Sequence, residues 1–320
     1  MHYQKELGRD ILNFLSQPEN QKLEASHLIE SFEIKKAVTG ADIFEEASAS
    51  GRYFFSPSDD SEGTVDDFKQ GWIVAAEKGS PLPHHSKDYV GSNVISISGK
   101  GLSRCKMTWS NRKEPEIFVK KQKNGENILY NVLTPAGHMT GPHMDNSGSG
   151  HDLGVSFGSK LILFWQPSEK VLEDYKLMHG LNRGNLTANC VKCWPGLHWV
   201  ILRTGESIVI SPGIIHAVLS ADNSVASGWN FLNSEWICNG SMKVMVEWEL
   251  KVIEERWTEK GSLKKSLYGR HGILNSLKQD MNMWKDWMNT SLKNDEIMKD
   301  LRDLINLVNK RLQKIDKVGK

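Results

Sequence analysis

Two histidines and one aspartate of this chain have the residue types and the spacing of an iron site. His143 and Asp145 are separated by one residue, and His216 follows 73 residues after the first histidine. Two imidazoles and one carboxylate on one face of an iron ion leave the opposite coordination positions open, which is the arrangement of non-heme Fe(II) oxygenases. The sequence therefore predicts a metal-dependent redox site formed by these three side chains.

The surrounding sequence places the three residues at the ends of strands. The first two follow the apolar run ILYNVL at 128–133 after a short turn. His216 follows the apolar run ESIVIS at 206–211 and a Pro-Gly bend. Pairing between two such strands would bring the three ligands together.

Lys160 and Thr140 suggest a second substrate for such an iron site. 2-Oxoglutarate would chelate iron through its keto-acid end and present its distal carboxylate to the protein. Lys160 opens the apolar run KLILFW, and Thr140 lies three residues before His143. A lysine is a suitable point-charge partner for a buried carboxylate. We therefore predict that Lys160 and Thr140 bind this carboxylate; the alternative is that Lys160 only marks an exposed strand start.

Six short runs between residues 93 and 233 predict β-strands. They are rich in Val, Ile, Leu and Trp, and Gly, Pro, Asn and Ser separate them. The runs are 93–98, 128–133, 160–165, 198–203, 206–211 and 217–221. Many short strands with irregular loops predict a sandwich or a barrel, and the double-sheet jelly roll of the cupins is one such fold. Its central cavity suits a metal.

Helical segments are predicted toward both ends of the chain. Apolar residues recur at spacings of three and four over 7–15 and resume over 23–32. A short helix is expected near 65–76, and residues 241–257 have helical composition. Asn294 can cap a final helix, which either packs on the barrel or forms a dimer. Its apolar stripe comprises Ile297, Leu301, Leu304, Ile305, Val308, Leu312 and Ile315.

The fold class predicted from these patterns is mainly β with flanking helices. We divide the chain into an N-terminal helical and loop region over 1–90, a jelly-roll core over 91–240 and a C-terminal helical region over 241–320.

The overall charge is nearly balanced, with a net value of +1, which argues against a nonspecific grip on nucleic acid by the whole chain. Residues 251–320 hold 16 Lys and Arg against 10 Asp and Glu. This basic segment could contact DNA or another acidic partner, but we favour a solvated helical face. Neither a membrane-spanning apolar run nor a secretory signal is legible, so we expect an intracellular protein.

The four cysteines do not predict a disulfide scaffold in a chain of 320 residues. Cys190 and Cys193 form a CxxC pair, but a tetrahedral zinc site needs four ligands and no second pair is legible. We interpret these thiols as core or strand-edge residues.

The chain resembles the JmjC family of Fe(II)- and 2-oxoglutarate-dependent oxygenases, which includes the histone lysine demethylases. The likeness is to the branch that contains the F-box/CXXC-type and PHD-finger-type demethylases. In that branch a Thr stands three residues before the first ligand His and a Lys seventeen after it, as Thr140 and Lys160 do here. The stretch GESIVISPGIIHAVLSADNSVASGWNFLNS is similar around the last ligand, and the likeness covers about residues 90–250.

This resemblance implies a JmjC jelly roll that binds Fe(II) and 2-oxoglutarate through the residues named above. It also implies that Tyr130 corresponds to an aromatic residue near the cosubstrate and that Asn230 corresponds to a polar residue of the substrate pocket. The substrate would be a methylated histone tail or another protein, in the nucleus, and chromatin partners would contact the helical regions. Hydroxylation of an N-methyl group would release formaldehyde, with succinate and CO2 as coproducts.

The chain departs from this branch at Leu153, where the family usually has a Tyr that helps to hold the cosubstrate. Three functions therefore stay open: a histone lysine demethylase, a JmjC hydroxylase of another protein side chain, and a JmjC scaffold with little turnover. The intact metal set together with Lys160 speaks against the scaffold.

Overall fold

The computed structural model of this chain describes the barrel strands, the helices that flank them and four isolated short strands. The described ranges are 2–32, 54–55, 62–63, 94–95, 117–118, 130–134, 136–137, 139–145, 148–178, 189–258, 270–290 and 292–318. The helix expected near 65–76 lies outside the described residues.

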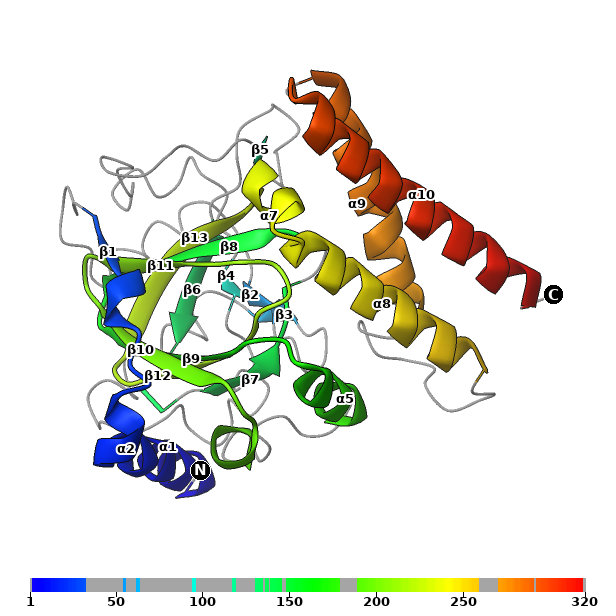
Figure 1. The fold of residues 1–320 in the computed structure, drawn as a ribbon. Coiled ribbons are helices and arrows are strands. Elements are labelled where there is room, and N and C mark those ends of the chain that lie inside the picture. The colour runs from blue at the N-terminus through cyan, green and yellow to red at the C-terminus, as the bar shows by residue number, and fades with distance from the viewer. Residues whose placement is uncertain are drawn as a thin grey trace.

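Eight strands form a barrel of two facing antiparallel sheets (Figure 1). They are β6 (Tyr130–Thr134), β7 (Met139–His143), β8 (Gly150–Phe157), β9 (Ser159–Trp165), β10 (Leu197–Arg203), β11 (Glu206–Ile210), β12 (Ile215–Ser220) and β13 (Ser224–Leu232). One sheet has the order β10-β9-β12-β7, and the other contains β11-β8-β13-β6. The chain passes from one sheet to the other at nearly every connection, as in a jelly roll. The predicted fold class, mainly β with a jelly-roll core and helices at both ends, is confirmed.

Short strands extend the second sheet at both edges. At one edge β1 (Glu30–Ser31) pairs with β11, whereas β5 (Ile117–Phe118) pairs with the end of β13 in the middle of the sheet. The other edge carries β4 (Val94–Ile95), β2 (Phe54–Phe55) and β3 (Glu62–Gly63) beyond β6.

The space between the sheets is filled by every second residue of the strands. On β9, Ile162 and Phe164 belong to one buried cluster with Leu153 of β8 and Ile208 of β11. Successive side chains of a strand point to opposite faces. Lys160, two residues before Ile162, therefore also points into the barrel.

The outer face of the smaller sheet is covered by the N-terminal helices α1 (His2–Leu15) and α2 (Pro18–Gln21), as Figure 1 shows. Ile11 and Leu15 of α1 belong to the same core cluster as Leu219 of β12. Gly8 has room for a β-carbon, since the nearest atoms would be the δ-carbons of Leu219 at 3.5 Å.

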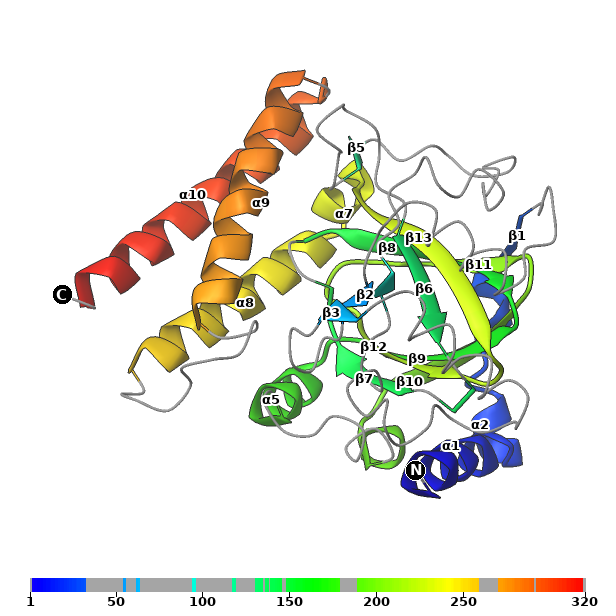
Figure 2. The ribbon, with the colours of Figure 1, turned by 180° about the vertical axis from the view of Figure 1, so that it is seen from behind.

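The C-terminal helices form a separate layer beside the barrel (Figure 2). They are α7 (Ser234–Cys238), α8 (Ser241–Thr258), α9 (Arg270–Thr290) and α10 (Asp295–Val318). Asn294 caps α10 as predicted, because its Oδ1 accepts hydrogen bonds from the backbone N–H groups of Glu296 and Ile297, at 3.0 and 3.2 Å. The apolar stripe of α10 from Ile297 to Leu312 packs on the preceding helices of the same chain, and Arg311 forms an ion pair with Glu254 of α8.

One prediction about secondary structure is wrong. Residues 23–32 are not a second amphipathic helix but contain the 3-10 turn η1 (Ser26–Leu28) and β1. The backbone of Ala25 donates to the carbonyl of Trp199 at 2.8 Å, so pairing with the barrel overrides the local periodicity. Of the two CxxC thiols, which we interpreted as core or strand-edge residues, Cys190 is buried in the core and Cys193 is exposed, and both stand in a helical turn at 189–193.

Three barrel strands, β7, β8 and β13, have no counterpart among the predicted runs. All three contain Gly, with Pro in β7, Asp in β8 and Asn in β13, and these residue types lower strand propensity. Within the described part of the chain, no helix is long and apolar enough to cross a membrane.

Candidate metal centre

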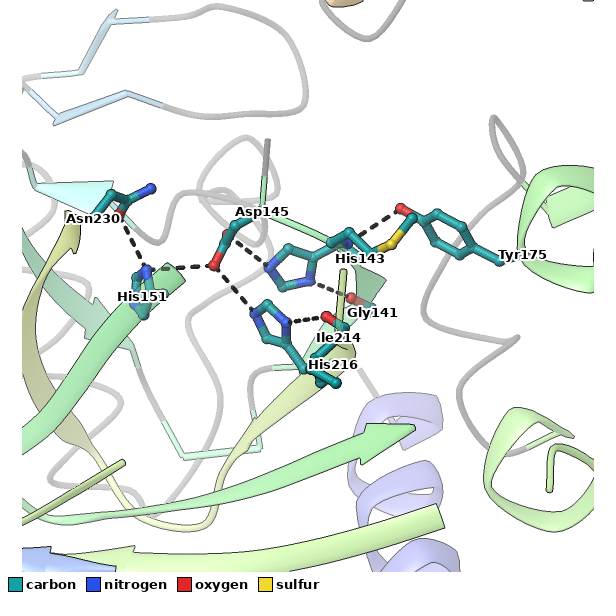
Figure 3. Close-up of polar contacts among 9 residues, drawn as sticks. Gly141, His143, Asp145, His151, Tyr175, Ile214, His216 and Asn230 are labelled. Atoms are coloured by element: carbon teal, nitrogen blue, oxygen red, sulfur yellow. Dashed lines mark hydrogen bonds and ion pairs between the residues drawn. The ribbon is translucent and has the colours of Figure 1, made fainter. Parts of the chain in front are cut away.

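The two candidate histidine ligands face each other across neighbouring strands. His143 ends β7 and His216 lies near the start of β12, and their Cα atoms are register partners in this antiparallel pair. Their ring centroids are 4.2 Å apart (Figure 3). A pairing between residues 73 positions apart in the sequence thus creates the first half of the site.

Asp145 completes the set from the segment just after β7. Its Oδ1 lies 4.0 Å from Nε2 of His143, and its Oδ2 lies 3.9 Å from Nε2 of His216. One ligand atom from each of the three residues lies within 4.8 Å of the other two. The structure therefore brings together all three residues that the sequence singled out as metal ligands.

Backbone carbonyls orient both imidazoles toward this shared space. Nδ1 of His143 lies 2.9 Å from the carbonyl of Gly141, and Nδ1 of His216 lies 3.2 Å from the carbonyl of Ile214. Because a carbonyl oxygen only accepts, each Nδ1 carries the proton, and the unprotonated Nε2 is the nitrogen that can bind a metal. Metal-binding histidines in proteins are commonly held in this way.

The burial of Asp145 Oδ2 supports the same assignment. This oxygen is buried, and none of the described residues forms a hydrogen bond with it. A buried carboxylate oxygen without a partner is costly, and a bound cation relieves that cost. Two imidazoles and one carboxylate are the donors of a facial triad, so the residues present fit a divalent iron ion.

Helix α5 (Glu169–Met178) braces the segment between the first two ligands. The backbone N–H of Met144 donates to the hydroxyl of Tyr175 at 3.3 Å. The buried Tyr175 ring in turn packs against Trp248 of α8, with 5.1 Å between the ring centroids. No sequence pattern pointed to Tyr175, because this contact depends on how α5 docks against the barrel.

Lys160 forms a second polar cluster inside the barrel. Its side chain is buried, and Nζ donates to Oγ1 of Thr134 at 2.6 Å and to Oγ of Ser220 at 3.1 Å. Ser224 joins the cluster through Thr134, with 3.1 Å between their hydroxyl oxygens. Burial lowers the pKa of Lys160 to about 7. Among the described residues no carboxylate forms an ion pair with this ammonium group, so the cluster fits an incoming anion.

Thr140 shares a sheet face with Lys160, although neither of the hydrogen bonds of Lys160 goes to it. Thr140 is the register partner of Val218 on β12, and Lys160 is the partner of Ser220, two residues further along the same strand. Residues directly opposite in a sheet, and residues two apart in one strand, point to the same face. Thr134 and Ser220 were not predicted as members of this cluster.

Three other residues singled out in the sequence lie on the larger sheet. Tyr130 begins β6, and its side chain lies outside the described residues. Leu153 is buried in the apolar cluster between the sheets. Asn230 of β13 does not stand alone, because its Oδ1 lies 3.1 Å from Nδ1 of His151. Nδ1 of His151 also lies 3.5 Å from Oδ2 of Asp145 (Figure 3).

The CxxC pair does not contribute to the metal group found among the described residues. Cys190 is buried, and burial raises the pKa of its thiol to about 12, while Cys193 is exposed. Metals bind the thiolate form, which burial disfavours at Cys190.

No family model matches the chain. Two curated proteins named "JmjC domain-containing histone demethylation protein 1" are similar to it. The protein of Debaryomyces hansenii is 29% identical over 156 residues, which are 44% of this chain and 30% of that protein. The protein of Mycosarcoma maydis is 30% identical over 118 residues, which are 35% of this chain and 16% of that protein. The matched parts thus span less than a third of either relative. These similarities, on a barrel that brings two histidines and an aspartate together, support a relationship to the JmjC-domain proteins.

Proposed function

We propose that the chain is an Fe(II)- and 2-oxoglutarate-dependent oxygenase that removes methyl groups from lysine side chains of histones. The observation that carries this proposal is the convergence of His143, Asp145 and His216, whose ligand atoms lie within 4.8 Å of one another inside a jelly roll. The names of both similar proteins contain histone demethylation, which supports the choice of substrate and a nuclear location.

In the proposed reaction, the protein supplies binding, orientation and shielding from water. Nε2 of His143, Nε2 of His216 and the carboxylate of Asp145 would hold the iron on one face. When bound, Fe(II) and 2-oxoglutarate would supply the oxidising chemistry together with dioxygen: one oxygen atom enters the substrate C–H bond as a hydroxyl group, the other enters succinate, and 2-oxoglutarate loses CO2. If that carbon is an N-methyl group, the resulting hemiaminal loses formaldehyde and leaves the demethylated amine.

Lys160 would bind the distal carboxylate of 2-oxoglutarate. Its ammonium group is already held by Thr134 and Ser220, so little side-chain freedom remains to be lost on binding. A charge-assisted hydrogen bond in a buried place is stronger than one at the surface. Thr140, on the same sheet face, would contribute its hydroxyl.

The test is a turnover assay with a panel of methylated histone peptides. We expect the wild-type protein, given Fe(II), ascorbate and 2-oxoglutarate in air, to produce succinate and to lower the peptide mass by one CH2 unit for each methyl group removed. His143→Ala should abolish both, while His27→Ala, at an exposed histidine of η1, should leave both unchanged.

Other outcomes would contradict the proposal in distinguishable ways. A peptide that gains the mass of one oxygen atom would make the protein a hydroxylase of another side chain. A wild-type protein that binds neither Fe(II) nor 2-oxoglutarate in direct titrations would not be an oxygenase.

A further inference from the structure

We propose that His151 and Asn230 are positioning residues that hold the carboxylate of Asp145, so that it binds the metal through a single oxygen. This inference rests on the proposed iron site and adds two side chains outside the three ligands.

The contact between the two residues is built into the larger sheet. His151 lies on β8 and Asn230 on β13, and the two are register partners. Oδ1 of Asn230 lies 3.1 Å from Nδ1 of His151, and the side chain of His151 is only 14% exposed. Two strands therefore fix the imidazole before any ligand binds.

His151 touches a metal ligand but does not belong to the ligand set. Its Nδ1 lies 3.5 Å from Oδ2 of Asp145, as Figure 3 shows. The group of ligand atoms within 4.8 Å among the described residues contains His143, Asp145 and His216 without His151. This placement allows His151 to interact with the carboxylate of Asp145 and not with the metal itself.

The chemistry of the neighbours decides which atom of His151 carries the proton. The two groups near Nδ1 are the amide oxygen of Asn230 and a carboxylate oxygen of Asp145, and both accept hydrogen bonds. Nδ1 must therefore be the protonated nitrogen.

This donor restricts how Asp145 can bind a metal. Oδ2 is buried and accepts no hydrogen bond from the described residues, while the N–H of His151 lies beside it as a donor. An oxygen that accepts this N–H is a weaker second ligand, so the carboxylate binds through one oxygen. With two imidazoles, three positions of an octahedral ion then stay open for the cosubstrate and oxygen.

Manganese(II) is a suitable probe, because its affinity and its number of bound waters can both be measured by solvent-proton relaxation without turnover. We expect His151→Ala to weaken Mn(II) binding about 10- to 100-fold, as loss of an outer-shell partner does elsewhere. We also expect it to lose one metal-bound water, because Asp145 becomes bidentate. Asn230→Ala should cause a smaller change in the same direction, and His151→Gln should restore part of the affinity.

The matched control is His27→Ala, at an exposed histidine, which should keep the wild-type affinity and water number. Thermal unfolding of each variant establishes that it is folded. Folded His151→Ala with unchanged Mn(II) affinity and water number would overturn the proposal. If His151→Ala does not fold, then unchanged values in both His151→Gln and Asn230→Ala would overturn it equally. A wild-type protein that binds no Mn(II) would instead contradict the proposed iron site itself.

Discussion

The charge of Lys160 is at odds with its buried surroundings. Burial lowers its pKa to about 7, and hydroxyl groups of Thr134 and Ser220 are its hydrogen-bond partners. A carboxylate bound beside it would favour the charged form and raise its pKa again. Binding of the anion and protonation of this lysine are therefore coupled.

The first prediction concerns the affinity for 2-oxoglutarate with Mn(II) in place of iron. Below pH 7 Lys160 is already charged, so affinity should be flat with pH. Above pH 7 each binding event must take up a proton, so affinity should fall by up to about tenfold per pH unit. Calorimetric titrations in two buffers of different ionisation enthalpy measure this uptake directly. Lys160→Met should bind more weakly, by about 1.5–3 kcal/mol, and its affinity should not follow this pH profile.

The second prediction concerns the free energy of unfolding without ligand. The ordinary pKa of lysine is 10.5, and that of Lys160 in the folded protein is about 7. Between these values the unfolded chain holds a proton that the folded protein lacks, so stability should rise with pH across this window. Urea unfolding at pH 7 and pH 9 tests it against Lys160→Met, which should show a smaller rise. Equal rises in both proteins would contradict a perturbed Lys160.

At the scale of the elements, two glycines differ in the room that the structure leaves for a β-carbon. Gly150 starts β8, and a β-carbon there would lie 2.0 Å from the ring of Trp236 on α7. Gly8 lies within α1, where a β-carbon meets only the δ-carbons of Leu219, at an ordinary 3.5 Å. Close approach of a strand to a helix requires glycine at the first position, whereas nothing in the described structure requires it at the second.

We therefore expect Gly150→Ala to destabilise the protein by about 1–3 kcal/mol, because Trp236 must move. Gly8→Ala should stabilise it by up to about 1 kcal/mol, since alanine is the better helix former. Chemical denaturation of the two variants in parallel measures both effects. A neutral Gly150→Ala would mean that α7 is free to shift away from the barrel.

A structural feature is easier to predict from the sequence when the residues that form it are close together in the chain. The helix α10 is predicted from its stripe and from the cap at Asn294, which involve neighbouring residues. The metal set is predicted because its residue types are distinctive. Thr134 and Ser220 are not predicted as partners of Lys160, because only strand pairing brings them close to it. They lie 26 and 60 positions away from Lys160 in the sequence. Strand β8, with Gly150 and Gly154, is stabilised by ladders on both sides despite its low propensity.

At the scale of the whole molecule, the barrel and the helices among the described elements have different roles. The barrel presents the metal set and Lys160, while α5 and α8 stabilise the segment that carries Asp145. The division of the chain at residues 90 and 240 stays a prediction.

Binding of metal and cosubstrate to the folded protein alone should raise its stability. At a ligand concentration one hundred times the dissociation constant, the expected gain is about 2.7 kcal/mol. Differential scanning calorimetry with Mn(II), with and without 2-oxoglutarate, measures it. His143→Ala should lose the gain from Mn(II), and Lys160→Met should lose mainly the gain from 2-oxoglutarate. Identical melting temperatures for wild type and His143→Ala under all conditions would contradict this.

The order of strands in the larger sheet has a consequence for the synthesis of the protein. β13, the last barrel strand to leave the ribosome, lies between β8 and β6 in the middle of its sheet. Until residues 224–232 emerge, the facing edges of β6 and β8 have no partner, and unpaired edges invite association with other chains. A chain that ends at residue 222 should therefore aggregate, whereas adding a peptide of residues 223–234 in trans should keep part of it monomeric in sedimentation experiments. The barrel is thus most prone to aggregation just before its final strand is synthesised, because that strand lies in the middle of the larger sheet.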